Sequence, residues 1–198
     1  MDLYRVKPVV LRGLEPVLDR FERHGIRPDA LTLAAVPVAA VGGLAIIASP
    51  AAPLALLVVP AAAVARLVLN LLDGALARRT GATHSRGEFY NELGDRLGDV
   101  LMLAPVAFVP GSHPPTVLMG VTMAILASFT SVATKAAGGT RTYRGILSKP
   151  GRMALLVVSA IVVIVVGPDG WAPFGPILLL GATLTLVERI AVALRELR

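Results

Sequence analysis

The sequence predicts an all-α polytopic membrane protein, in which a cytoplasmic interfacial amphipathic helix precedes six transmembrane helices. Two observations predict this class. Hydrophobic residues make up 55% of the 198 residues and charged residues 16%, with a mean hydropathy of +0.73, which is far more apolar than a soluble domain of this length. Lys and Arg also gather in alternate connections between apolar stretches. Because the sequence has no evident internal repeat, we expect a single membrane domain over residues 1–198.

Six apolar stretches account for the predicted transmembrane helices. Each is close to the roughly 20 residues that cross about 30 Å of hydrocarbon. Residues 31–198 are therefore expected to form a six-helix bundle. The stretches cover residues 31–49, 53–77, 93–110, 115–136, 152–167 and 173–193.

The distribution of Lys and Arg predicts the orientation of these helices. Basic residues precede the first stretch, separate the second from the third and the fourth from the fifth, and end the chain, whereas the other three connections have none. Positively charged loops stay in the cytoplasm, so both termini are expected on the cytoplasmic side of the plasma or inner membrane. Trp171, beside a connection on the opposite face, is typical of an interfacial anchor. The basic residues are Arg5, Lys7, Arg12, Arg20, Arg23, Arg27, Arg78, Arg79, Arg86, Arg141, Arg144, Lys149, Arg195 and Arg198.

Residues 1–30 contain an amphipathic segment and a turn that leads into the first span. Val10, Leu14, Val17, Leu18 and Phe21 recur at helical spacing, with charged residues on the other side. This pattern predicts a helix that lies on the cytoplasmic leaflet. The alternative is a helix whose apolar face packs on the protein's own loops.

Polar side chains follow one stripe on each of the second and third predicted helices. Ionisable groups at membrane depth are costly, so both stripes are expected to face a cavity inside the bundle. Oxygen ligands gathered in this way suit a hard cation such as Mg²⁺ or Mn²⁺. The stripes comprise Arg66, Asn70, Asp73 and Ala77 on the second helix, and Asn91, Asp95 and Asp99, flanked by Glu88 and Glu92, on the third.

Residues 70–95 resemble the signature of the CDP-alcohol phosphotransferase (CDP-alcohol phosphatidyltransferase) family, D-x2-D-G-x2-A-R-x8-G-x3-D-x3-D. The chain departs from it at the first and third aspartate positions, which hold Asn70 and Asn91. The six spans and the preceding helix are also similar to this family. The positions that match the signature are Asp73, Gly74, Ala77, Arg78, Gly87 and Asp95.

The resemblance implies a transferase of phospholipid biosynthesis that depends on one or two Mg²⁺ or Mn²⁺ ions. An acceptor alcohol attacks the phosphorus of a CDP-linked donor, usually CDP-diacylglycerol, and CMP leaves. It further implies that Asp73 holds metal, that Asp95 is the catalytic base or a metal ligand, and that a homodimer forms. A nucleic acid partner is not expected. The implied nucleotide and diphosphate pocket comprises Gly74, Ala77, Arg78 and Gly87.

The two asparagines leave three interpretations open, because an amide attracts cations less than a carboxylate does. In the first, Asn70 and Asn91 are neutral metal ligands or hydrogen-bond partners, and nearby acids together with the donor's diphosphate restore the charge. In the second, the enzyme uses one ion. In the third, the chain binds CDP-lipid or phospholipid without transfer. The acids considered are Glu88, Glu92 and Asp99, whose simpler interpretation is ion pairing with Arg86 or Arg96 at the membrane edge.

A second, basic group is predicted to hold the phosphate of a phosphorylated acceptor, since arginine binds phosphate oxygens in a bidentate manner. It comprises Lys135, Arg152 and Arg189. Arg141, Arg144 and Lys149 are interpreted instead as anchors for anionic headgroups, and His84 as a solvated loop residue. A transporter is disfavoured because the outer half of the predicted bundle is nearly uncharged. The identity of the acceptor stays open.

Overall fold

The structure is a computed structural model that describes residues 7–197, all of whose regular elements are helical, as the sequence predicts. Arg5 and Arg198 lie outside the described residues. The elements are α1 (Lys7–Gly13), α2 (Glu15–Arg23), α3 (Pro28–Ala48), η2 (Pro53–Leu57), α4 (Val58–Arg79), α5 (Ser85–Leu103), η3 (Ala104–Phe108), α6 (Pro114–Ala136), α7 (Lys149–Val166), η4 (Pro168–Trp171) and α8 (Phe174–Glu196), where η marks a 3₁₀ helix.

Within residues 7–197, five helical segments are long and apolar enough to cross a membrane. They are Pro28–Ala48, Pro53–Arg79, Pro114–Ala136, Lys149–Val166 and Pro168–Glu196. The remaining long helix, α5, was predicted to begin near residue 93 but begins at Ser85, so its first half carries the acidic residues of the motif. Its apolar second half continues into η3. The bundle therefore has six long helices, one of which is polar over its first turns.

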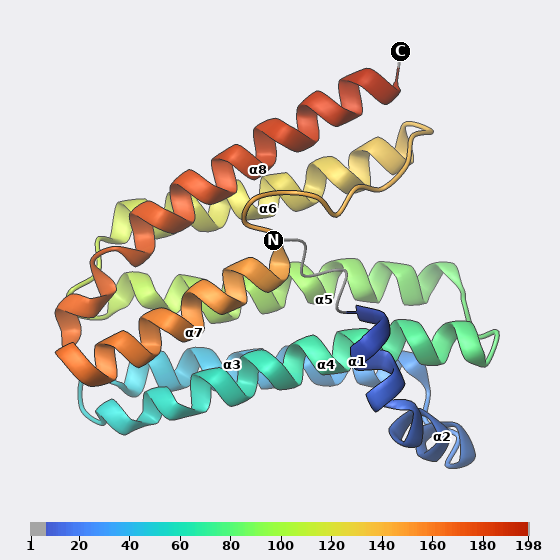
Figure 1. Ribbon diagram of the computed structural model, residues 1–198, viewed down its shortest axis with the longest axis horizontal. Helices are drawn as coiled ribbons and strands as arrows, with labels where there is room; N and C mark the ends of the chain where they lie inside the picture. Colours follow the sequence, from blue (N-terminus) through green and yellow to red (C-terminus); the bar gives the residue numbers. More distant parts are fainter. Residues whose placement is uncertain (1–6, 198) are drawn as a thin grey trace.

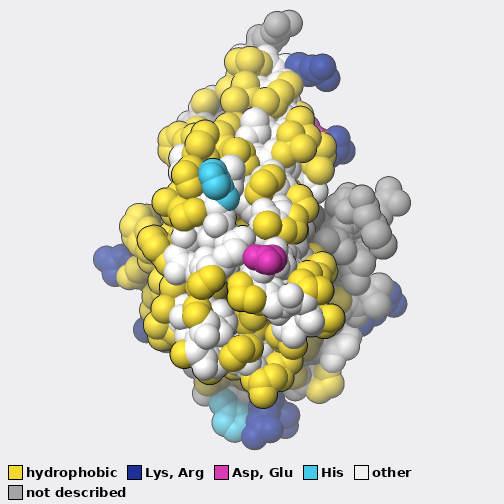
Figure 2. All heavy atoms as spheres, turned by 90° about the vertical axis from the view of Figure 1, so that its left-hand side faces the viewer, with side chains coloured by type: hydrophobic (Ala, Val, Ile, Leu, Met, Phe, Trp, Pro, Cys, Tyr) yellow, Lys and Arg dark blue, Asp and Glu magenta, His cyan; other side chains and the backbone are white. Residues whose placement is uncertain are grey.

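The six long helices pack as neighbouring pairs (Figure 1). α3 contacts both α4 and α5, α6 packs along α8, and α7 contacts α4 and α8. The short connections α3–α4, α5–α6 and α7–α8 lie at one end, which we name the uncharged end. Figure 2 views this end, where hydrophobic and uncharged polar atoms predominate. The loops at 80–84 and 137–148 lie at the other, charged end.

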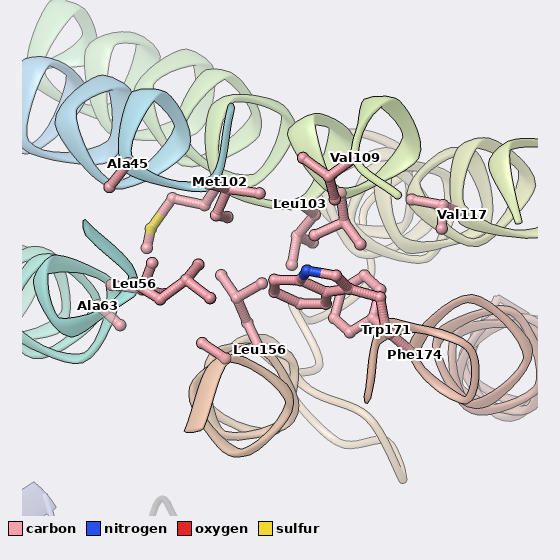
Figure 3. Close-up of a cluster of buried hydrophobic side chains, with 14 of the residues drawn as sticks. Ala45, Leu56, Ala63, Met102, Leu103, Val109, Val117, Leu156, Trp171 and Phe174 are labelled. Carbon is pink, nitrogen blue, oxygen red and sulfur yellow. The ribbon is translucent and has the colours of Figure 1, made fainter. Parts of the chain in front are cut away.

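Trp171 belongs to the apolar core rather than to the surface. Its side chain is 1% exposed and meets Phe174 edge to face, with ring centroids 5.8 Å apart. Figure 3 shows both rings directed towards Leu103 and Leu156. The interpretation of Trp171 as an interfacial anchor is therefore wrong, because η4 turns the ring back into the bundle.

The amphipathic segment forms two short helices that pack on α3 and α4. Leu18 is buried, in a cluster with Leu31, Leu72 and Leu76. On the polar side, Arg79 at the end of α4 forms ion pairs with the α2 acids Glu15 (3.1 Å), Asp19 (2.5 Å) and Glu22 (2.7 Å). This part of the apolar face therefore packs on helices α3 and α4 of the protein itself, and not on its loops as the alternative had it.

Candidate active site

Five of the six matching signature residues line one cavity at the charged end, which we name the motif cavity. It lies between the start of α3, the second half of α4, the 80–84 loop and the first turns of α5, and has a volume of about 510 Å³. This volume lies within the range of ligand pockets. Its lining includes Asp73, Gly74, Ala77, Arg78, Gly87, Glu88, Asn91 and Lys135.

A second, smaller cavity of about 50 Å³ lies beside it, and we name it the basic cavity. Arg141 lines both cavities, so they are neighbours. Asp95 lies on the basic cavity and not among the residues that line the motif cavity. The lining of the basic cavity includes Asp95, Asp99, Ser128, Ser131, Arg141, Tyr143, Lys149, Arg152 and Arg189.

Asp73 is held in place by donors from two helices. Its carboxylate accepts a 2.7 Å hydrogen bond from the Thr32 hydroxyl on α3 and another from the backbone N–H of Gly74. The residue is buried, yet it lines the motif cavity. These contacts fix the direction in which Asp73 presents its oxygens.

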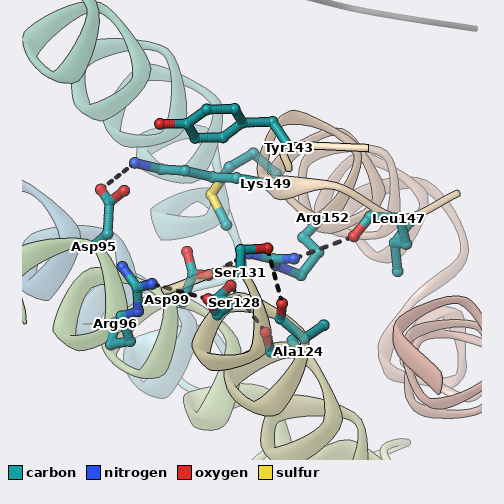
Figure 4. A network of polar contacts seen from close by, with 12 residues as sticks. Asp95, Arg96, Asp99, Ala124, Ser128, Ser131, Tyr143, Leu147, Lys149 and Arg152 are labelled. Atoms are coloured by element: carbon teal, nitrogen blue, oxygen red, sulfur yellow. Dashed lines mark hydrogen bonds and ion pairs between the residues drawn. The ribbon is translucent and has the colours of Figure 1, made fainter. Parts of the chain in front are cut away.

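Asp95 is held by two donors on the same oxygen. The Asn70 side-chain amide donates to Oδ1 at 2.8 Å, and the Lys149 ammonium forms an ion pair with that atom. Figure 4 shows Lys149 reaching from the start of α7 to Asp95. Asn70 thus contacts the proposed base directly, whereas Asn91 lines the motif cavity.

A buried triad of two arginines and one aspartate lies beneath Asp95. Arg66 Nη1 is 2.9 Å from one oxygen of Asp99, and Arg152 Nη2 is 2.6 Å from the other. Arg66 also donates to the backbone carbonyl of Asp95 at 2.7 Å. A Cβ at Gly98 would lie 2.4 Å from Arg66 Nε, so this glycine makes room for the guanidinium. The carboxylate of Asp99 is therefore the shared counter-ion of Arg66 and Arg152.

The other two acids considered for charge compensation also face basic groups. Glu92 forms ion pairs with Arg96 (2.5 Å) and Arg141. Glu88 forms an ion pair with Lys135, and the hydrogen bond from that ammonium lowers the pKa of Glu88. Pairing of Glu92 with Arg96 is the simpler interpretation that the sequence had allowed.

The three predicted phosphate-binding residues do not form one group. Lys135 lies on the motif cavity, whereas Arg152 and Arg189 lie on the basic cavity. Arg152 is bound to Asp99. Arg189 donates to three backbone carbonyls, those of Ala127 (2.7 Å), Arg144 (2.8 Å) and Tyr143 (3.4 Å), and so fastens the 137–148 loop to α6 and α8.

The oxygen donors at the junction of the cavities fit a divalent cation. Two carboxylates, Asp73 and Asp95, and two amides, Asn70 and Asn91, are ligands that Mg²⁺ and Mn²⁺ accept. Over residues 7–197, however, no group of three or more His, Asp or Glu side chains is placed to hold an ion.

Sequence reasoning missed the roles of Lys149 and Thr32. Lys149 was interpreted as a headgroup anchor, but its ammonium contacts Asp95. One signal was available: Lys149 and Arg152 are three residues apart and hence share a face of α7. Thr32 offered no comparable signal, because its contact with Asp73 depends on how α3 packs against α4.

His84 is exposed, as expected, and it also caps α5. Its Nδ1 accepts a 3.0 Å hydrogen bond from the backbone N–H of Gly87, and Nε2 lies 3.4 Å from a carboxylate oxygen of Asp29. Because an N-cap satisfies a donor that the helix leaves free, His84 holds the first turn of α5 at the edge of the motif cavity.

Removal of this cap is expected to loosen the first turn of α5. His84→Ala should cost about 1 kcal/mol locally, whereas His84→Ser, which keeps a capping oxygen, should cost less. Hydrogen exchange at the Gly87 amide measures the difference. Equal protection of this amide in both variants would contradict a capping role.

The sequence and the fold both match known proteins. The sequence profile of the CDP-alcohol phosphatidyltransferase family matches residues 26–191. Inner membrane protein YnbA of Escherichia coli is 30% identical over 152 residues, which are 77% of this chain and 75% of that protein. The phosphatidylinositol phosphate synthase of Mycolicibacterium smegmatis is 28% identical over 73% of this chain and 66% of its own length.

Crystal structures of the Mycobacterium tuberculosis phosphatidylinositol phosphate synthase share the fold. The structure with CDP-DAG bound has a TM-score of 0.74 at 20% identity and covers 90% of this chain and 92% of that one. The structure in complex with manganese and citrate has the same TM-score and identity, over 90% of this chain and 88% of that one. Since the family profile spans most of the sequence, the chain belongs to the CDP-alcohol phosphatidyltransferase family, whose members are membrane transferases.

Proposed function

We propose that the chain transfers a phosphatidyl group from a CDP-linked lipid, with CDP-diacylglycerol as the first candidate, to an acceptor alcohol and releases CMP. The observation that carries this proposal is that five matching signature residues line one cavity and the sixth, Asp95, lines the neighbouring one. The mycobacterial synthase with CDP-DAG bound supports the choice of donor. In the reaction, the acceptor oxygen forms a bond to phosphorus, the bond from phosphorus to CMP breaks, and the acceptor's proton passes to Asp95.

The two cavities are proposed to bind different substrates: the motif cavity binds the donor, and the basic cavity binds the acceptor. The motif cavity takes the nucleotide and diphosphate, with Arg78 as their cationic partner and Gly74, Ala77 and Gly87 allowing close approach. Asp95 lies beside it on the basic cavity, where the acceptor hydroxyl arrives. Hydrogen bonding from Asn70 fixes the direction of this carboxylate.

Asp73 and Asp95, with Asn70 and Asn91, are the residues proposed to hold Mg²⁺ or Mn²⁺. When bound, such an ion neutralises charge that builds on the departing CMP. The manganese complex of the mycobacterial synthase supports this cofactor. Glu88, Glu92 and Asp99 are assigned to ion pairs with Lys135, Arg96, Arg141, Arg66 and Arg152.

The acceptor is proposed to be a small alcohol that already carries a phosphate. Arg141, Arg152 and Arg189 line the basic cavity together with the Ser131 hydroxyl, and these are donors suited to phosphate oxygens. The named activity of the mycobacterial relatives agrees with a phosphorylated product. Lys135, on the motif cavity, is assigned to the donor side.

The charged end is proposed to face the cytoplasm of the plasma or inner membrane, because Lys and Arg gather there. The active site and both termini then share that side. The E. coli relative is itself named an inner membrane protein. A homodimer in the bilayer is part of the same proposal.

The test is release of CMP from CDP-diacylglycerol by the purified chain in lipid nanodiscs, with a panel of plain and phosphorylated alcohols. Release is expected only with Mg²⁺ or Mn²⁺, and fastest with phosphorylated alcohols. Chelation of the ion should stop it. Donor binding without release for every acceptor would refute transfer and favour a silent lipid-binding homologue.

A further inference from the structure

The cation that contacts Asp95 is one that the chain itself supplies. The Lys149 ammonium forms an ion pair with Asp95 Oδ1, and the two side chains are only 16% and 22% exposed. Lys149 is the first residue of α7, so the helix fixes where its side chain starts. The carboxylate of Asp73 also lies close enough to interact electrostatically with both Asp95 and Lys149. Lys149 therefore pairs directly with Asp95, and its charge also acts on Asp73.

The formal charges of the three acids and three bases that interact here balance before any ion binds. Asp73, Asp95 and Asp99 supply three negative charges, and Arg66, Lys149 and Arg152 supply three positive ones. A site with aspartate at positions 70 and 91 would have two more negative charges. Cations are attracted to such sites largely by charge. Asparagine at both positions removes two carboxylates. It thereby removes the negative charge that would attract a second divalent ion.

We propose that Lys149 is a built-in cation that takes the place of one divalent ion, so that the site binds one Mg²⁺ or Mn²⁺ instead of two. This inference deepens the proposed function and rests on it. Asn70 and Lys149 act on the same atom: Asn70 donates its amide to Asp95 Oδ1, and Lys149 supplies a positive charge at that oxygen. Lys149 thus positions Asp95 and sets the number of ions.

The test is a titration with Mn²⁺ alone, in which the electron paramagnetic resonance signal of free Mn²⁺ reports how many ions each chain binds. The wild type is expected to bind one. Lys149→Met should bind Mn²⁺ about tenfold more tightly, because a neighbouring positive charge is gone. Lys149→Arg, which keeps that charge, is the matched control and should bind as the wild type does.

A second pair of variants tests directly whether a second Mn²⁺ ion can bind. With Asn70→Asp and Asn91→Asp combined with Lys149→Met, two ions should bind; with the same two aspartates and Lys149→Arg, one should bind. Circular dichroism melting checks that every variant is folded. Two ions in the wild type, or the same number in the Met and Arg backgrounds, would overturn the inference.

Failure of this inference can be distinguished from failure of the proposed function, because Mn²⁺ binding is read without turnover. If the wild type releases CMP but binds two ions, only the role of Lys149 is refuted. If it binds one ion and Lys149→Met tightens binding, but no acceptor yields CMP, the role of Lys149 in the charge of the site stands and transfer is refuted.

Discussion

Asp95→Asn is expected to lower the rate of CMP release by about 100-fold or more, the usual contribution of a general base. The amide has almost the same shape but cannot take a proton, and it also loses the ion pair with Lys149. The measurement is the initial rate of CMP release in nanodiscs with donor, acceptor and Mn²⁺ at saturating concentrations. Binding of the donor should change much less, because the motif cavity does not include Asp95.

The matched control for this variant is Asp169→Asn. Asp169 is an exposed acid in η4 at the uncharged end, far along the bundle from the signature residues. The Asp169→Asn variant should release CMP at the wild-type rate. An unchanged rate in Asp95→Asn would assign proton transfer to a different group, whereas equal losses in both variants would indicate a general effect of removing an acid.

Local patterns predicted the parts of the site that lie on one continuous piece of chain. Asp73, Gly74, Ala77 and Arg78 follow the helical repeat of α4, and Gly87 lies in the first turn of α5. Helix period and the short 80–84 loop determine that these residues face one cavity. The clustering of these five residues could therefore be predicted before the packing of the bundle was known.

Contacts between distant helices could not be predicted in this way. Lys149 and Thr32 reach the site from α7 and α3, and their contacts depend on how those helices pack. Arg189 was predicted to bind phosphate because its type suits phosphate; it lines the basic cavity, and it also donates to backbone carbonyls of a loop whose path the sequence does not specify. Residue type alone does not distinguish these partners.

The same limit applies to apolar surfaces. The spacing of Leu18 and its neighbours predicted an apolar helix face, and the structure buries Leu18. The sequence cannot distinguish contact with lipid from contact with α4, since both partners are apolar. Trp171 was misplaced for a related reason: aromatic residues near a connection favour the interface, but the tight turn of η4 directs this ring inward.

Asp99→Asn is expected to be the most destabilising single substitution in the site, at about 3–5 kcal/mol, the usual cost of removing one partner from a buried ion pair. The amide would leave Arg66 and Arg152 charged, nearly inaccessible and without a counter-ion between them. Since Arg66 also holds the backbone of Asp95, the first half of α5 should loosen as well. The melting temperature of the purified protein in one detergent measures the loss.

A triple variant separates lost charge balance from lost packing. In Asp99→Leu with Arg66→Met and Arg152→Met, apolar side chains of similar shape or length fill the same space and none of these three buried charges remains. Replacing a whole buried ion group is often neutral or stabilising, so the triple variant should melt well above Asp99→Asn. If the triple variant melts at a temperature as low as Asp99→Asn, the loss of stability comes from changed packing and not from unbalanced charge. A wild-type melting temperature for Asp99→Asn would show that the two arginines find other partners, and that the triad does not hold α4, α5 and α7 together.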